Sequence, residues 1–499
     1  MTPPFRRLRE LMAQLEDLER VGGLLSWDQE TKLPRAGAEA RAEQRATIER
    51  LAHELVGGDE LARVLDELGD DSFESGSLEA ALVRVARRDH EKARRVPARL
   101  RADMTRASAL GIAAWWEAHA RDDYRLLLPH LERQLELKRR YVECFDRFDD
   151  PYDVLLDDYE EDMKTEKVAE VFAVLKRELV PLVAEVAAAE PVDDSFLHRK
   201  WDREAQRAFS LGVLERLGFE PTSWRLDDTQ HPFTAAPSSR DIRLTTRFDS
   251  ENIHGIFSCL HEFGHGLYER QVGEELARTP LAHGASSALH ESQSRIWENL
   301  FGRSRSFWSY FYPRLQEKFP AALGRVDEEK FYRGINKIEP SLIRIDADEV
   351  TYNLHIILRF ELERELVAGD LPAHELPDAF DAKMDEYLRL RPPNVSRGVI
   401  QDMHWAEGML GHFPTYSLGN VISVQLWERA RAEIPDFDDR IEHGEFAPLR
   451  DWLRERLHRF GRMLPPREVR LLAAGADVDP GPYLAYLRRK AADVAGLSP

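Results

Sequence analysis

The chain has 499 residues, and 43% of them are hydrophobic, so a large core is available. Its net charge of −20 argues against nonspecific nucleic-acid binding and against docking on anionic membranes, because both need a cationic surface. Two cysteines, a charged N-terminal segment and charges within every long apolar stretch lead us to expect a cytoplasmic protein without a membrane span.

Most of the sequence has the apolar spacing of amphipathic helices. Apolar residues recur three and four positions apart in residues 5–20, 37–56, 78–96, 126–145, 165–189 and 203–217. Residues 218–249 differ, because "DIRLTTRF" alternates apolar or hydroxyl side chains with polar ones, which predicts a strand in a small sheet or hairpin. Helical spacing resumes at about residue 250 and continues to the end of the chain.

These patterns predict a mainly α protein with one small β element. We expect a single domain over residues 1–499. Within it, an N-terminal helical lobe over residues 1–200 forms one wall of a cleft, and residues 201–499 hold the motifs that suggest chemistry.

The segment "SCLHEFGHGLYE", residues 258–269, suggests a metal site. We expect a helix from 250 to 271, with Asp249 or Ser250 as its N-cap. On that helix His261 and His265 lie on one face and can hold one zinc ion, while Glu262 lies beside them as a general base towards water. The alternative is chance, because 17 histidines give roughly a one-in-six probability that such a pair arises by accident.

A catalytic zinc needs a third protein ligand, and Glu291 is the candidate. It follows His265 by 26 residues, which is enough for a loop and a return helix capped by Ser286 or Ser287. The alternative is an exposed glutamate in the first turn of that helix. Spacing alone leaves both interpretations open.

Several motifs together resemble one known family. They are "SWDQET" at 26–31, "HPF" at 231–233, "DIRLT" at 241–245, "HEFGH" at 261–265, "HESQ" at 290–293, "IRIDAD" at 343–348 and "GVIQDMHW" at 398–405. In this order they resemble the carboxypeptidase Taq metallocarboxypeptidases. The resemblance implies a mainly helical, zincin-like fold with a deep groove, an exopeptidase activity and a homodimer.

The resemblance also implies roles for individual residues. It implies that His261, His265 and Glu291 bind Zn²⁺, for which Co²⁺ can substitute, and that Glu262 is the general base. The oxyanion formed during hydrolysis needs a further donor, and His404 and Tyr416 are the candidates. The structural alternative for Tyr416 is a buried tyrosine whose hydroxyl is hydrogen-bonded within the fold.

A carboxypeptidase must also bind a free C-terminal carboxylate, for which the planar fork of arginine is suited. Arg344 in "IRIDAD" is the stronger candidate and Arg243 in "DIRLT" the weaker one. Their structural alternatives are ion pairs with Asp348 and Asp241. His231 in "HPF" is a further substrate-binding candidate that could equally have a structural role.

Two other histidines lie outside the implied ligand set, for different reasons. His412 in "GHFPTY" stands where the family usually has an aromatic residue, commonly tyrosine, so it changes donor strength and pH dependence if that position faces the site. His355 lies in an apolar segment, "TYNLHIILRF", and we interpret it as a packed histidine or an outer partner.

The leading hypothesis is therefore a cytoplasmic zinc carboxypeptidase of broad specificity that acts on short peptides with a free C-terminal carboxylate. One alternative is a zinc endopeptidase or oligopeptidase on a similar helical scaffold, and the closed end of the groove distinguishes the two. Another is a helical binding protein without catalytic activity. The replacement of Glu262 or of one of the three expected ligands would have favoured it, but all four residues are present.

Overall fold

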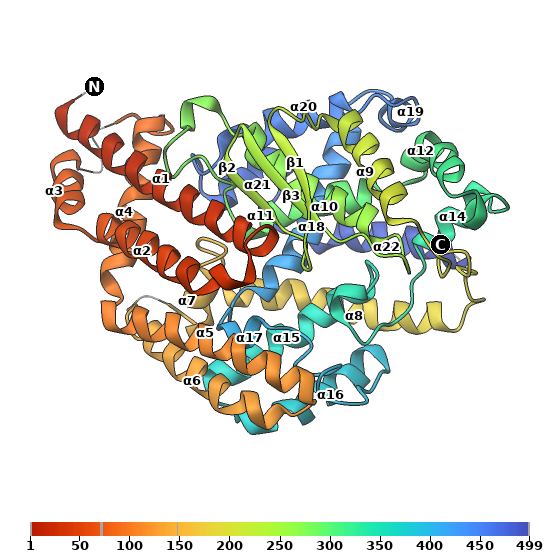
Figure 1. Ribbon diagram of the computed structural model, residues 1–499, viewed down its shortest axis with the longest axis horizontal. Helices are drawn as coiled ribbons and strands as arrows, with labels where there is room; N and C mark the ends of the chain where they lie inside the picture. The colour runs from red at the N-terminus through yellow and green to blue at the C-terminus, as the bar shows by residue number, and fades with distance from the viewer. Residues whose placement is uncertain (1, 70–72, 147, 498–499) are drawn as a thin grey trace.

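The computed structural model describes residues 2–69, 73–146 and 148–497, and they are mainly helical (Figure 1). The helices before the sheet are α1 (Pro3–Thr31), α2 (Ala38–Val56), α3 (Asp59–Leu68), α4 (Leu78–Arg95), α5 (Ala98–Arg121), α6 (Tyr124–Val142), α7 (Pro151–Leu156), α8 (Thr165–Ala187) and α9 (Arg203–Leu217). The helices after it are α10 (His254–Gln271), α11 (Ser287–Arg295), α12 (Arg305–Lys318), α13 (Pro320–Leu323), α14 (Glu328–Ile335), α15 (Thr351–Ala368), α16 (Leu376–Leu388), α17 (His404–Glu407), α18 (Phe413–Glu433), α19 (Phe437–Glu442), α20 (Ala447–Arg456), α21 (Pro466–Ala474) and α22 (Pro480–Ala495).

The predicted β element is a three-stranded sheet that lies against α10. Its strands are β1 (Trp224–Asp228), β2 (Thr234–Ser238) and β3 (Asp241–Thr246), in the order β1-β3-β2. β3 pairs parallel with β1 and antiparallel with β2, so β2 and β3 form the hairpin. A Cβ at Gly266 would lie within 3.0 Å of side chains of β1 and β3, so this glycine of α10 allows the helix to touch the sheet.

Two further glycines bring the motif-bearing helices together. A Cβ at Gly264 of α10 would lie 2.5 Å from the carbonyl oxygen of Gln293 and 2.6 Å from the Cα of Ser294 in α11. A Cβ at Gly419 of α18 would lie 2.7 Å from the Cβ of Glu291. The helices α10, α11 and α18 therefore pack backbone to backbone around Glu291.

The expected helix start at 250 is wrong, because α10 begins at His254. The side chains of Asp249 and Asn252 accept hydrogen bonds from the backbone amides two residues ahead, of Glu251 and His254. These local turns compete with helix formation over the first four positions. The cap predicted for the return helix is confirmed, since the Ser286 hydroxyl accepts the amide hydrogen of Leu289.

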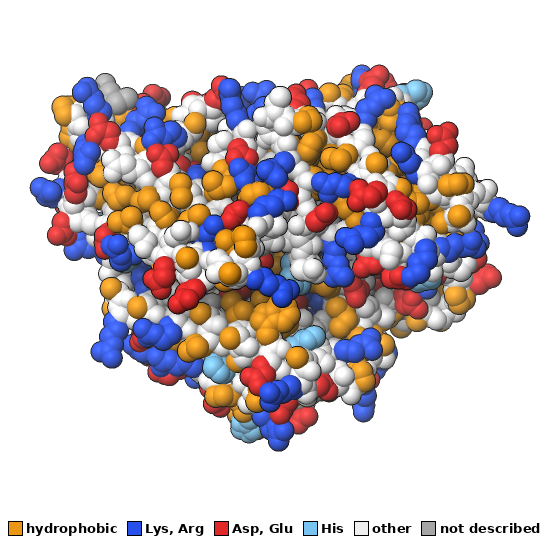
Figure 2. Space-filling model, in the orientation of Figure 1, with side chains coloured by type: hydrophobic (Ala, Val, Ile, Leu, Met, Phe, Trp, Pro, Cys, Tyr) orange, Lys and Arg blue, Asp and Glu red, His pale blue; other side chains and the backbone are white. Residues whose placement is uncertain are grey.

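A hollow crosses the molecule between the part that contains the sheet and the part that contains α5, α6, α15 and α16 (Figures 1 and 2). Helices from before and after residue 200 lie on both sides of it, and α8 packs against α15, α16 and α22. The division into a lobe over residues 1–200 and a region over 201–499 stays a prediction. In the part of the chain that the structure describes, no helix has the length and apolar character needed to cross a membrane.

Candidate metal centre

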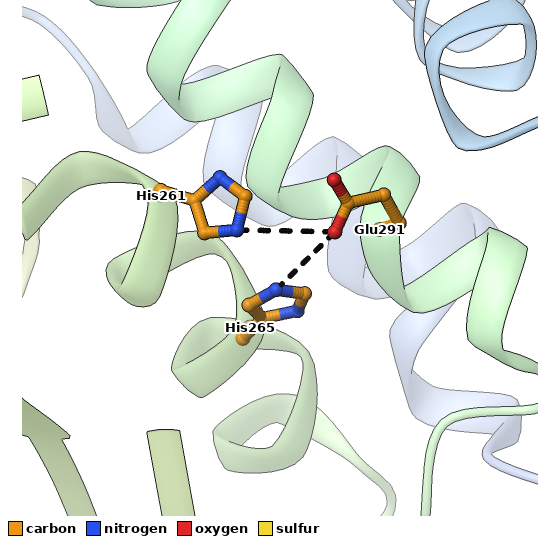
Figure 3. Close-up of side chains that lie close together, drawn as sticks. All are labelled: His261, His265 and Glu291. Carbon is orange, nitrogen blue, oxygen red and sulfur yellow. Dashed lines mark ion pairs between the residues drawn. The ribbon is translucent and has the colours of Figure 1, made fainter. Parts of the chain in front are cut away.

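Three side chains from two helices point toward one another (Figure 3). Nε2 of His261 and Nε2 of His265, both on α10, lie 3.8 and 3.6 Å from Oε2 of Glu291 on α11. Glu291 is buried, with 5% of its surface exposed, so the alternative of an exposed first-turn glutamate is wrong. The two helices place two imidazoles and one carboxylate at a single point.

The outer nitrogen of His261 is held by Glu298. This carboxylate follows α11 in the π-helical segment Ile296–Phe301, and its Oε2 lies 2.8 Å from Nδ1 of His261. Arg295 donates hydrogen bonds to Oε1 of Glu291 at 2.7 Å and to Oε2 of Glu298 at 3.2 Å. Although burial alone would raise it, Arg295 and His261 lower the pKa of Glu298 to about 2, so Glu298 is an anion that orients His261.

The outer nitrogen of His265 is held by a longer chain of partners. Nδ1 of His265 lies 2.7 Å from Nδ1 of His290, and Nε2 of His290 lies 3.1 Å from Oε1 of Glu269. Since Glu269 accepts a hydrogen bond from Nε2 of His290, the tautomer that satisfies every partner has Nδ1 of His265 donating to Nδ1 of His290. Nε2 of His265 then carries no proton and faces Glu291.

These donors fit a divalent metal. Each histidine has its Nδ1 engaged and its Nε2 free, and the three inward atoms lie within 4.8 Å of one another. Bonds of about 2.1 Å in a tetrahedral site would place such atoms about 3.4 Å apart, a few tenths of an ångström from the separations to Glu291. Two imidazoles and one carboxylate form a common ligand set for catalytic zinc, with a fourth position left open.

Glu262 lies on the same helix as the two histidines, and a residue of the sheet holds its side chain in place. Its side chain is 4% exposed, and its Oε2 accepts a hydrogen bond of 2.7 Å from the hydroxyl of Thr234 in β2. Burial raises the pKa of this carboxyl above its ordinary value. Thr234 directly follows Phe233, the last residue of the "HPF" motif. The backbone amide of Phe233 donates to the hydroxyl of Thr245, and its carbonyl oxygen accepts a hydrogen bond from the same hydroxyl.

The candidate oxyanion donors lie next to each other. Nε2 of His404, on α17, lies 3.2 Å from the hydroxyl of Tyr416 on α18. Burial lowers the pKa of His404 to about 3, so its imidazole is neutral. The ring of His412 lies 4.9 Å from that of Tyr416 and 4.8 Å from that of Tyr159, so this unusual histidine is part of the same aromatic cluster.

Arg344 is buried, and its partner is not the Asp348 of the structural alternative. Its Nε and Nη2 donate to Asp402, at 3.1 and 2.8 Å, and its Nη1 donates to the hydroxyl of Tyr352 at 2.9 Å. Asp402 also pairs with Arg359. Oδ1 of Asp348 instead accepts hydrogen bonds from the backbone amides of Val350 and Thr351 at the start of α15.

The other two candidate substrate-binding residues are placed differently. Arg243 forms the expected ion pair with Asp241, with both oxygens engaged, and its guanidinium lies 4.3 Å from the ring centre of Trp27 in "SWDQET". His231 is exposed, and within the described ranges its side chain has no recorded hydrogen bond or ion pair. His355 is packed as expected, fully buried with Nε2 bound to the carbonyl of Ser341.

Several residues of this centre were missed from the sequence. Glu298 lies seven positions after Glu291 on the same helical face, which is the one local signal that could have identified it. Thr234, His290 and Asp402 stand beside or within quoted motifs, but nothing in the sequence assigns them partners. Two cavities flank the centre, one of 780 Å³ that includes Glu298 in its lining and one of 580 Å³ that includes His290.

Comparison with known proteins identifies the family. Residues 7–491 match the family described as carboxypeptidase Taq (M32) metallopeptidase. The chain belongs to this family. It is 39% identical to thermostable carboxypeptidase 1 of Thermus thermophilus over 99% of this chain and 100% of that protein. It is 33% identical to carboxypeptidase 1 of Bacillus subtilis over 96% of each chain.

Solved structures of M32 carboxypeptidases have the same fold. The crystal structure from Deinococcus radiodurans R1 has a TM-score of 0.96 at 39% identity, covering 99% of this chain and 100% of the other. The Pyrococcus furiosus carboxypeptidase has a TM-score of 0.95 at 35% identity, covering 98% and 99%. The protein is thus a metallocarboxypeptidase that acts on peptides, and His261, His265 and Glu291 are its candidate metal site.

Proposed function

We propose that this M32 carboxypeptidase is a zinc enzyme of broad specificity that removes C-terminal residues from short peptides. The observation that supports it most is the convergence of His261, His265 and Glu291 beside the buried carboxylate of Glu262. A zinc ion held there supplies Lewis acidity, which lowers the pKa of water towards ~7 and polarises a carbonyl. Co²⁺ has similar preferences for ligands and is proposed as a substitute for Zn²⁺.

We propose that Glu262 takes the proton from the attacking water and passes it to the leaving amine. The hydroxyl of Thr234 fixes Oε2 of this carboxylate and leaves Oε1 for the water. Tyr416 and His404 are the proposed donors to the oxyanion. Neutral His404 has a single N–H, which can serve only one of two acceptors: the oxyanion itself or the tyrosine oxygen. In the second case Nε2 of His404 donates to Tyr416, and the phenol proton of Tyr416 is free to point at the substrate.

Arg344 is the proposed partner of the C-terminal carboxylate. Asp402 accepts hydrogen bonds from Nε and Nη2 of its guanidinium, and the Tyr352 hydroxyl accepts one from Nη1. These contacts fix the guanidinium 5.3 Å from the ring centre of Tyr416 and leave a second N–H on Nη1 and on Nη2 for the carboxylate. Arg243, paired with Asp241 and stacked on Trp27, is better suited to hold the sheet than to bind substrate. A role for His231 and the homodimer rest on the resemblance to the family, and the proposed cytoplasmic location rests on the low cysteine content.

Metal reconstitution tests this proposal. The protein freed of metal by a chelator should regain activity on an N-blocked dipeptide with one equivalent of Zn²⁺, and also with Co²⁺. Glu262→Gln should bind the metal as tightly as the unaltered protein but lose at least about 10²-fold in kcat. Glu291→Gln should lose the metal. Full activity in Glu262→Gln, or activity that survives complete removal of metal, would contradict the proposal.

A further inference from the structure

Arg20, in the N-terminal helix, contacts three segments that each lead to the metal centre. Its side chain is largely buried, with 17% exposed, although Arg20 is far in sequence from the motifs that hold the metal centre. Figure 1 shows α1 along the edge of the sheet beside β2, and Arg20 lies on this helix.

The first segment is the strand that holds the base. Nη1 of Arg20 donates a 2.5 Å hydrogen bond to the carbonyl oxygen of Ala236 in β2. Ala236 lies two residues after Thr234, whose hydroxyl binds both the carboxylate and the backbone carbonyl of Glu262. A shift of β2 at Ala236 would therefore move the hydrogen bond that orients Glu262.

The second segment is the chain of partners behind His265. Nη1 of Arg20 also lies 3.4 Å from Oε2 of Glu269, while Oε1 of Glu269 lies 3.1 Å from Nε2 of His290, the partner of His265. Glu269 is buried, with a side chain 9% exposed, so it needs a cation to remain an anion. Nδ1 of His283 also lies 3.9 Å from Oε2 of Glu269.

The third segment is the loop that leads into α11. Nη2 of Arg20 donates a 2.6 Å hydrogen bond to the carbonyl oxygen of Ala282, a few residues before the helix that carries Glu291. Nε donates to Glu16 on its own helix, which fixes the guanidinium plane. The planar fork of arginine can satisfy these separate acceptors at once, whereas the point charge of lysine cannot.

We propose that Arg20 is a positioning residue that fixes the strand bearing the Thr234–Glu262 contact and the His290–His265 pair relative to each other. The inference rests on the proposed roles of Glu262 and His265. It predicts that Arg20 acts on metal binding and on turnover, without touching substrate or metal. Outer partners of metal ligands change metal affinity by 10- to 100-fold. Arg20 lies two contacts beyond the outer partner His290, through Glu269, so an effect at the lower end of that range, about tenfold, is expected.

The test compares Arg20→Met and Arg20→Lys with a matched control, Arg278→Met. Arg278 also ties α1 to the loop before α11, through both oxygens of Asp17, but it is exposed and leads to no residue of the centre. Zinc affinity is measured by competition with a chelator, kcat and KM with a blocked dipeptide, and stability by urea unfolding of the zinc-loaded proteins.

Arg20→Met should bind zinc about tenfold more weakly and lose about tenfold in kcat with little change in KM. Arg20→Lys, which keeps the charge, should fold normally and recover only part of both losses, while Arg278→Met should match the unaltered protein in both. If the Arg20 variants unfold at lower urea concentration but keep the zinc affinity and kcat of the unaltered protein, the inference is overturned and Arg20 has a purely structural role. Equal losses in Arg278→Met would overturn it too. Failure of the unaltered protein to bind zinc would overturn the proposed function as well.

Discussion

The close contact between α10 and α11 at Gly264 makes a strong prediction about the metal centre. Gly264 lies between Glu262 and His265, and an added methyl group would meet the Gln293 carbonyl oxygen at 2.5 Å and the Ser294 Cα at 2.6 Å. Ordinary contacts of this kind are about 3.5 Å, so Gly264→Ala requires the two backbones to separate by about 1 Å. Both obstructing atoms are backbone, and no side chain can rotate away to make room.

A separation of 1 Å is too large for the ligand geometry. Metal–ligand distances must be correct within about 0.2 Å, so Glu291 could not reach a metal held by the two histidines. Loss of a direct ligand exceeds the 10- to 100-fold effect of losing an outer partner, so zinc affinity should fall by at least about 100-fold. Overpacking should also lower the free energy of unfolding by about 1–3 kcal/mol.

The matched control is Gly212→Ala in α9. Gly212 is an exposed helical glycine whose added Cβ would have no neighbour within 4 Å. That substitution should stabilise the protein by about 0.5–1 kcal/mol and leave zinc binding unchanged. Chelator competition and urea unfolding measure both quantities. If Gly264→Ala bound zinc as tightly as Gly212→Ala, the backbone contact would not set the position of Glu291.

Three more outcomes are expected. Glu298→Gln should weaken zinc binding by about 10- to 100-fold in the same competition assay, because His261 loses its anionic partner; unchanged affinity would refute that role. Arg344→Lys should raise KM for free-acid peptides and reduce the preference for them over C-terminally amidated ones; an unaltered preference would remove Arg344 from carboxylate recognition. The third concerns His355, whose pKa burial and Arg359 lower to about 3. Between pH 6.5 and 3 the unfolded chain binds a proton there that the folded chain does not, so this group makes the free energy of unfolding fall as the pH falls, by up to about 1.4 kcal/mol per pH unit. The free energy of unfolding of His355→Gln, measured with urea, should therefore fall less steeply than that of the unaltered protein between pH 7 and pH 5. Parallel curves for the two proteins would contradict this.

The helices and the candidate metal site could be predicted because their signals are local. Apolar spacing locates α9 at residues 203–217, and the four-residue spacing of His261 and His265 places them on one helical face. The start of α10 was misplaced because Asp249 and Asn252 bind nearby backbone amides, which competes with capping.

The partners of the site residues could not be predicted, because they come from distant segments. Arg344 pairs with Asp402, which is 58 residues away, and not with the aspartate one helical turn ahead. Thr234 reaches Glu262 only because β2 lies across α10, and Arg20 reaches Glu269 only because α1 lies along the sheet. Such pairings depend on how helices and strands pack, and the periodicity of the sequence contains no information about that.

The measurement that tests the account most directly is mass spectrometry of the products from an N-blocked ten-residue peptide. It compares the zinc-loaded protein, the chelated protein and Glu262→Gln. The account predicts a ladder of single-residue losses from the C-terminus with the zinc-loaded protein and an intact peptide in both controls. Internal fragments, or a ladder that persists without metal or with Glu262→Gln, would contradict it.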